Sequence, residues 1–292
     1  MKRLAVVLVV LLATLFAALP AVAGSQARTY EVTLLDFPGA GATYFDGANG
    51  HGQAVGGYFD AAGGHAFLYD NGDFVTLPVE DSPFSFAFDI NDRGDIVGFY
   101  ANENFEFYGF LLDRHGEFIS LAVPGAVETS ASGINNSGVI VGIYTEAYPA
   151  VYRGFKWADG VLTYPIDVPP PDPGLPAGIT DIHEINEKGQ IVGSVTDFAT
   201  YSYAFIMEPD GTINYYPPED TLAHESAFRG INNRGQVVGS LDGKFWLYDR
   251  GETVLIDMPG AFYSTINAIG AEGTMFGWTS LEDGVHGVMI DR

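Results

Sequence analysis

A ten-residue phrase recurs six times along the chain, and its spacing restricts the folds that the chain can adopt. In its fifth copy the phrase reads Gly-Ile-Asn-Asn-Arg-Gly-Gln-Val-Val-Gly. The copies occupy residues 47–56, 89–98, 133–142, 184–193, 230–239 and 268–277. Successive copies lie 38 to 51 residues apart. That period is typical of one four-stranded propeller blade per repeat.

Each phrase is predicted to form a strand, a tight turn and a second strand. Asn and Gly at the turn tolerate positive φ, as tight hairpins require. The closing glycine falls inside the second strand, where a missing side chain indicates a bulge or a close neighbour. A third strand with an aromatic residue follows, as in residues 108–112, and a fourth strand follows a glycine turn, as in residues 74–77.

The two ends of the chain complement each other. Residues 30–35 match the fourth strand of the later repeats but precede the first phrase, whereas the sixth repeat ends at its third strand, residues 285–290. We therefore predict an all-β, six-bladed β-propeller of four-stranded blades, closed by an N-terminal strand that completes the last blade.

These repeats resemble the bacterial extracellular repeat proteins called the HAF family. His65, Ala66 and Phe67 reproduce the triplet behind that name. The other five copies retain little beyond the aromatic residue, and the last copy, which ends at Val288, loses even that. The resemblance implies an exported repeat protein and transfers no established chemistry.

The N-terminus has the features of a secretory signal peptide. Lys2 and Arg3 precede a largely apolar run over residues 4–19, and Pro20 is followed by an Ala-Val-Ala box at residues 21–23. This order predicts cleavage before residue 24, although an uncleaved membrane anchor is the alternative. We expect a signal peptide at 1–23, one propeller domain at 24–292, secretion or periplasmic location, and no membrane insertion after cleavage.

The chain carries a formal net charge of −24 and contains no cysteine. An acidic surface repels nucleic acid and attracts cations or basic partners, or it simply keeps an exported protein soluble. The absence of cysteine excludes disulfides, thiol catalysis and thiolate metal sites. A domain of this size is large enough to be held by packing alone, and we expect a monomer.

One hydroxyl residue occurs at the same place in every repeat, five residues before the central apolar position. A ring of six hydroxyls could form a site, but a buried hydroxyl commonly satisfies a neighbouring backbone group, and we favour that interpretation. The residues are Thr43, Ser85, Thr129, Thr180, Ser226 and Ser264.

Aromatic and acidic residues gather in the loops between the second and third strands of repeats 2 to 4. Aromatic faces beside carboxylates suit stacking on a sugar or gripping a basic peptide, although such rings also pack loops onto blades. The candidate binding residues there are Phe105, Tyr148, Tyr152 and Tyr201.

A second group of candidates lies near the inner strands, two residues before the central apolar position. That position holds Asp46, Phe88, Ser132, His183, Arg229 and Asn267. In the fourth repeat Asp181 and Glu184 flank His183, a set that suits acid–base chemistry or metal binding. Regular alternation sends Glu184 to the opposite side of the strand, so we interpret the histidine as structural.

No HExxH, GxSxG, phosphate-loop or dinucleotide motif is present. We predict a non-enzymatic binding protein for a glycan or a basic protein, with no catalytic residue, metal or cofactor assigned. The alternative is a polysaccharide hydrolase or lyase with carboxylates at the channel mouth. That alternative gains support if the five polar candidates (Asp46, Asp181, His183, Glu184 and Arg229) share one pocket and have shifted pKa values.

Overall fold

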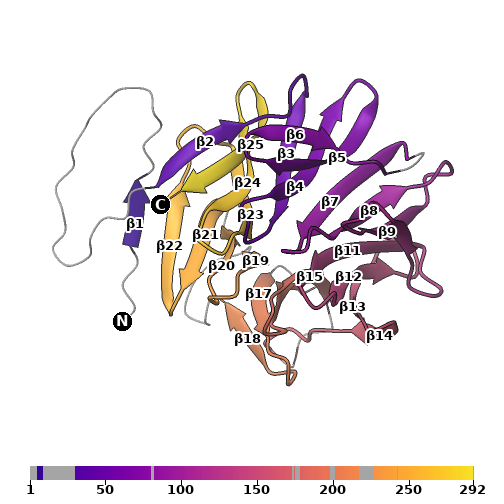
Figure 1. The fold of residues 1–292 in the computed structure, drawn as a ribbon. Helices are drawn as coiled ribbons and strands as arrows, with labels where there is room; N and C mark the ends of the chain where they lie inside the picture. Colours follow the sequence, from indigo (N-terminus) through magenta and orange to yellow (C-terminus); the bar gives the residue numbers. More distant parts are fainter. Residues whose placement is uncertain are drawn as a thin grey trace.

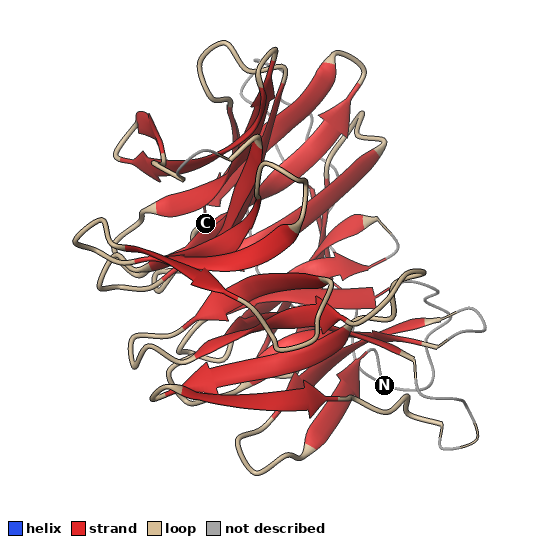
Figure 2. Cartoon of the chain, turned by 90° about the vertical axis from the view of Figure 1, so that its right-hand side faces the viewer, coloured by secondary structure: helices blue, strands red, loops and turns tan. Residues whose placement is uncertain are grey.

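The computed structural model describes residues 5–8, 30–79, 82–172, 174, 178–197, 201–216, 226–241 and 243–291. Within these residues the chain forms β-strands and contains no helix, which confirms the all-β prediction (Figure 2). Accordingly, none of the described segments is a helix long and apolar enough to cross a membrane.

The strands, in chain order, are β1 (Ala5–Leu8), β2 (Glu31–Leu35), β3 (Ala42–Ala48), β4 (Ala54–Asp60), β5 (Gly63–Asp70), β6 (Asp73–Thr76), β7 (Phe84–Ile90), β8 (Ile96–Ala101), β9 (Phe107–Leu112), β10 (Phe118–Leu121), β11 (Glu128–Ile134), β12 (Ile140–Thr145), β13 (Arg153–Ala158), β14 (Val161–Ile166), β15 (Ile179–Ile185), β16 (Ile191–Thr196), β17 (Ser202–Met207), β18 (Ile213–Tyr216), β19 (Ser226–Ile231), β20 (Val237–Leu241), β21 (Lys244–Asp249), β22 (Glu252–Asp257), β23 (Tyr263–Ile269), β24 (Met275–Leu281) and β25 (Gly284–Asp291).

Each repeat forms a unit of antiparallel strands. Unit 1 is β3 to β6, unit 2 β7 to β10, unit 3 β11 to β14, unit 4 β15 to β18, unit 5 β19 to β22, and unit 6 begins with β23 to β25. β2 pairs antiparallel with β25, from Glu31 opposite Asp291 to Leu35 opposite Gly287. The N-terminal strand therefore occupies the fourth-strand position of unit 6.

The units radiate from a common centre (Figure 1). The first strands contact one another in the order β3, β7, β11, β15, β19 and β23, and β23 also contacts β3. Single parallel pairs link some neighbours, such as Gly64 with Phe84 between units 1 and 2. Units 4 and 5 form separate sheets in the described residues, so the hydrogen-bonded sheet is not continuous. This radial arrangement of four-stranded units is that of a β-propeller.

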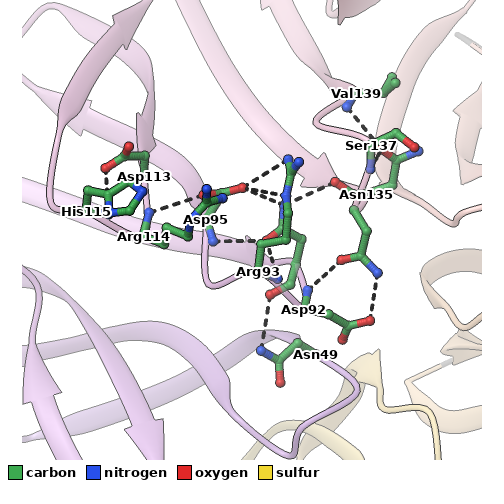
Figure 3. Close-up of polar contacts among 12 residues, drawn as sticks. Asn49, Asp92, Arg93, Asp95, Asp113, Arg114, His115, Asn135, Ser137 and Val139 are labelled. Atoms are coloured by element: carbon green, nitrogen blue, oxygen red, sulfur yellow. Dashed lines mark hydrogen bonds and ion pairs between the residues drawn. The ribbon is translucent and has the colours of Figure 1, made fainter.

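Each phrase forms the predicted turn, but its asparagine acts differently from our expectation. The turn glycine has positive φ, as at Gly94 (85°), whereas Asn91 and its counterparts do not. Instead, Asn91 Oδ1 accepts hydrogen bonds from its own turn, and Asn91 Nδ2 donates to the carbonyl of Asn135 in the next unit. Equivalent bonds run from unit 1 through unit 6. Figure 3 shows polar contacts around the turns of units 1 to 3.

The closing glycine of each phrase faces a backbone carbonyl, which confirms the predicted close approach. A Cβ placed on Gly193 would lie 2.1 Å from the carbonyl oxygen of Asp181. At the equivalent glycine of the other units the distance is 1.9 to 2.1 Å. Any larger residue at this position would push the first and second strands apart.

The hydroxyl residues that recur at one position of every repeat bond to nearby groups, as predicted. Thr43 Oγ1 accepts from the backbone N–H of Phe37, and Thr180 Oγ1 accepts from that of Val168. Ser264 Oγ instead bonds Thr279 Oγ1. These contacts anchor the inner strands, and the hydroxyls do not form a ring-shaped site.

The innermost positions alternate between glycine and a residue with a side chain. Gly47, Gly133 and Gly230 press against the backbone of the following unit, at Asp89, Glu184 and Ala268. A Cβ on Gly47 would lie 2.5 Å from the Cα of Asp89. Units 1, 3 and 5 thus provide the space into which the backbones of units 2, 4 and 6 fit.

Apolar side chains fill the spaces between neighbouring units. One cluster joins units 5 and 6 and includes Val238, Ile266 and Val288, together with Tyr30 and Val32 from the N-terminal segment. The predicted signal peptide lies outside the described residues except for β1, which pairs in parallel with β22.

Candidate functional site

A β-bulge interrupts the first strand of every unit, and it determines where the candidate residues point. In β3 the bulge lies between Phe45 and Gly47, and in β15 between Ile182 and Glu184. A bulge adds one unpaired residue and redirects its side chain. The six bulge residues all line one central cavity: Asp46, Phe88, Ser132, His183, Arg229 and Asn267.

The cavity has a volume of about 290 Å³, and its two sides differ in chemistry. Phe88 and Phe99, both from unit 2, contribute aromatic rings. The remaining lining from units 1 and 3 to 6 is mostly polar and comprises Asp46, Glu128, Thr129, Ser130, Ser132, Ile143, Tyr152, Asp181, His183, Glu184, Arg229 and Asn267. The cavity therefore presents an apolar surface opposite a set of hydrogen-bonding groups.

The expectation that Glu184 lies apart from Asp181 and His183 is wrong. It assumed regular alternation, but the bulge at His183 shifts the register, so that Ile182 faces Gly193 and Glu184 faces Val192. All three side chains consequently line the cavity. Asp46 and Arg229 line it too, so the five polar candidates do converge.

Asp46 is the cavity carboxyl that titrates near neutrality. Burial raises its pKa to about 7, while Arg229 and a hydrogen bond from Asn267 act in the opposite direction. Asn267 Nδ2 donates to Asp46 Oδ1 over 2.9 Å and also to the carbonyl of Phe45. Asp46 is therefore held in one orientation and is partly protonated at neutral pH.

Asp181 differs from Asp46 in its protonation. Burial acts to raise its pKa, but His183 and Arg229 outweigh that effect and hold the pKa below its usual value. Asp181 Oδ2 lies 3.3 Å from His183 Nε2. The cavity thus holds one carboxyl that is protonated in part and one that is ionised, a difference that acid–base catalysis requires.

Glu184 lines the cavity and also links two units. Its Oε2 accepts a hydrogen bond from the backbone N–H of Ile231, over 2.9 Å. Burial, and then the nearby charge of Asp89, raise its pKa. Asp89 makes the equivalent link from unit 2 to the N–H of Ile134, and burial raises its pKa to about 7.

Arg229 brings a positive charge to the polar side. Its Nε is buried and has no hydrogen-bond partner among the described residues. A buried donor without a partner is costly, so this atom is available to a ligand oxygen. The guanidinium has five donors in a fixed plane and can bind two adjacent oxygens at once.

The loop of unit 3 reaches the cavity through Tyr152, which bonds Glu128 at the start of β11. Tyr152 donates its hydroxyl to Glu128 Oε2 over 2.9 Å, and Tyr148 donates to the same oxygen over 3.3 Å. Burial, followed by this bond, raises the pKa of Tyr152 to about 12. Tyr152 lines the cavity, whereas Tyr148 is 64% exposed.

The other loop candidates lie outside the cavity lining. Phe105 is 66% exposed at a turn with φ of 58°, and Tyr201 is 39% exposed. Across the described residues, no group of three or more histidine or acidic side chains is arranged to hold a metal ion. Glu128 and Phe99 were not among the sequence candidates. Phe88 and Asn267 were recognised at the variable position, where five of the six residues are polar, but they were not chosen as binding residues.

No protein-family model matches the chain, and no curated protein matches it. Among solved structures, it is similar to a streptogramin B lyase structure, with a TM-score of 0.50 and 15% identity over 90% of this chain and 97% of that one. A virginiamycin B lyase from Staphylococcus aureus with Quinupristin has a TM-score of 0.48 and 13% identity, over 90% of this chain and 100% of that one. An Aleuria aurantia lectin with Fucalpha1-6GlcNAc has a TM-score of 0.47 and 11% identity, over 84% of this chain and 94% of that one. At 15% identity, the first likeness concerns the fold alone.

Proposed function

We propose that the protein is an exported, monomeric, six-bladed propeller of the HAF repeat type, closed by β2. Six repeats, the contact of β23 with β3 and the pairing of β2 with β25 support this architecture. Cleavage of residues 1–23 would leave the propeller at 24–292, secreted or periplasmic, without a membrane segment. Mass analysis of the exported protein and size-exclusion chromatography test these points.

The central cavity, on this proposal, binds one sugar residue of a glycan. The observation that carries it is the convergence of six bulge residues on a cavity with one aromatic and one polar side. Ligand sites typically combine apolar walls with a few placed polar groups. A pyranose has C–H groups on its faces and hydroxyls at its edge, so it can satisfy both sides at once.

The polar side offers both donors and acceptors for sugar hydroxyls. Arg229 Nε is an unpaired buried donor, and Asp181 and Glu128 supply carboxylate oxygens. Phe88 and Phe99 provide ring faces, with centroids 5.3 Å apart. Hydrogen bonds fix the orientation of the sugar, while stacking adds apolar contact without specifying one hydroxyl pattern.

Replacing Arg229 by Ala should weaken glycan binding, because the sugar would lose its only cationic donor from the bulge positions. We expect a loss of roughly 1 to 3 kcal/mol, about 5- to 150-fold in Kd. Glycan arrays followed by calorimetric titration measure it. The control is Arg234→Ala, which removes the same charge from an exposed ion pair with Glu272. Equal affinities for both variants would contradict the cavity site.

The loops of units 2 to 4 are the competing location, with a basic protein as the competing ligand. Under that alternative, the double variant Tyr148→Ala with Tyr201→Ala loses binding while Arg229→Ala does not. A basic-peptide array run beside the glycan array distinguishes the two ligands.

Cleavage of a glycosidic bond is a second candidate function, favoured by the contrast between Asp46 and Asp181. Asp46 could donate its proton to the leaving oxygen as the C–O bond breaks, while Asp181, positioned by His183, accepts a proton from the attacking water. Elimination by a lyase would use the same acid with a different base. The convergence of these groups strengthens this candidate relative to the sequence-based expectation.

If Asp46 is the acid, the rate should fall as pH rises through about 7, because Asp46 then loses its proton. Asp46→Asn should abolish turnover but keep binding. It should also raise stability at pH 8 more than at pH 4, since the unfolded carboxyl ionises near 3.8 and the folded one near 7, and ionisation in that window opposes folding. Unchanged turnover in Asp46→Asn would exclude this role.

A further inference from the structure

A continuous run of aromatic rings leads away from the cavity across units 2, 1 and 6. Successive rings belong to strands that neighbour one another around the centre. We call this run the aromatic rim; it comprises Phe107, Phe88, Phe99, Phe84, Phe86, Phe59, Tyr44, Trp278 and Tyr263.

The rim is unbroken between its two ends. Phe86 lies 6.2 Å from Phe99 and 6.0 Å from Tyr44, measured between ring centroids. Tyr44 lies 5.3 Å from Trp278, which stacks on Tyr263 at 5.4 Å. Because Phe99 also lines the cavity, the rim is continuous with it.

The rim is distinct from the hydrophobic core. None of its rings belongs to the six core clusters found among the described residues. All of them except Phe86 are only partly buried. The rim therefore lies outside the apolar clusters that contain Phe45 and Phe110, although Phe84 and Phe86 of unit 2 also pack against Gly64 and Gly57 of unit 1.

The rim occupies only half of the circle. At the position after the closing glycine, units 2 and 6 have Phe99 and Trp278, whereas units 4 and 5 have Ser194 and Ser240. At the start of the first strand, units 2 and 6 have Phe84 and Tyr263, but unit 3 has Glu128. The aromatic residues therefore lead to the cavity from one side of the ring only.

We propose that the aromatic rim binds further residues of a neutral, β-linked pyranose chain whose terminal or internal residue occupies the central cavity. This inference rests on the proposed sugar-binding function of that cavity. Equatorial linkages keep successive sugar rings nearly coplanar, so their C–H faces can stack along a line of aromatic rings. A chain of uronic acids is disfavoured, since the cavity holds several carboxyls and the protein carries a charge of −24.

The test compares hexasaccharides with single sugars. Cellohexaose, xylohexaose, laminarihexaose and chitohexaose are each titrated beside the corresponding methyl β-glycoside. At least one hexasaccharide should bind roughly tenfold or more tightly than its glycoside, a gain equal to one stacked hot-spot residue. Tyr263→Ala should remove most of that gain and leave glycoside affinity unchanged. Tyr164→Ala, which removes a partly exposed ring outside the rim, is the matched control.

A spectroscopic measurement guards against a folding defect in the variant. The chain has three tryptophans, and Trp278 is the one in the rim. Hexasaccharide binding to the unmodified protein should change tryptophan fluorescence, and Trp278→Phe should remove the change while retaining an aromatic ring. Methyl glycosides should not produce it.

The outcomes separate the rim from the cavity. If a hexasaccharide binds no more tightly than its glycoside, or if none of the four binds at millimolar concentration, the rim proposal is overturned. If Arg229→Ala leaves hexasaccharide binding intact while Tyr263→Ala abolishes it, the rim is retained and the proposed cavity function is wrong.

Discussion

Deleting residues 24–36 should leave most of the protein unfolded or aggregated. β2 supplies the whole outer pairing of β25, and its loss exposes an edge strand. Tyr30 and Val32 are buried with Val288 and Ile290, so their contacts vanish as well. We expect a loss of at least about 4 kcal/mol, judged from two large buried side chains. That is much of the 5 to 15 kcal/mol typical of a domain.

Thermal melting and light scattering of the deletion variant measure this effect. Deleting only residues 24–29 is the control, because it leaves Tyr30 and β2 in place. If the variant without residues 24–36 has the same melting temperature as the unmodified protein and stays monomeric, β2 does not close the fold.

Gly193→Ala should strongly destabilise the fold. Its Cβ would lie 2.1 Å from the carbonyl oxygen of Asp181 and 2.9 Å from the ring of Phe205, so β15 and β16 would have to separate. Overpacking of this kind costs typically 1 to 3 kcal/mol and occasionally more; we expect about 3. Ligand binding should weaken too, because β15 carries Asp181 and His183.

Gly41→Ala provides the matched control for this substitution. A Cβ there meets only the carbonyl oxygen of Phe59, at 3.8 Å, which is ordinary contact. Denaturant unfolding of both variants gives the comparison. Similar stabilities would show that the closing glycines are not required for close packing of the strands.

Local signals in the sequence predicted much of the fold. The positive-φ turn at Gly94, the close approach at Gly193 and the hydroxyl bond of Thr180 each follow from one residue type at one repeated position. The role of Asn91 was not predictable in this way. Its Nδ2 reaches a carbonyl 44 residues further along the chain, a contact that depends on how two units dock.

The candidate site was predicted in composition but not in arrangement. The position holding Asp46, His183 and Arg229 was recognised as variable and polar, but regular strand alternation separated Glu184 from His183. The closing glycine of the phrase indicated a bulge or a close neighbour at the second strand, but the extra residue lies in the first strand, opposite that glycine, where the sequence analysis assumed regular alternation. The loop residues Phe105 and Tyr201 were chosen from composition alone, and the structure leaves them outside the cavity lining.

The alternation of Gly47, Gly133 and Gly230 with Asp89, Glu184 and Ala268 has a consequence for changing the number of blades. The innermost circle repeats every two units rather than every one. Removing a single unit would place two glycines, or two residues with side chains, against each other at the new junction. Shorter or longer rings built from this chain should therefore be assembled from pairs of blades, with an odd-numbered unit always preceding an even-numbered one.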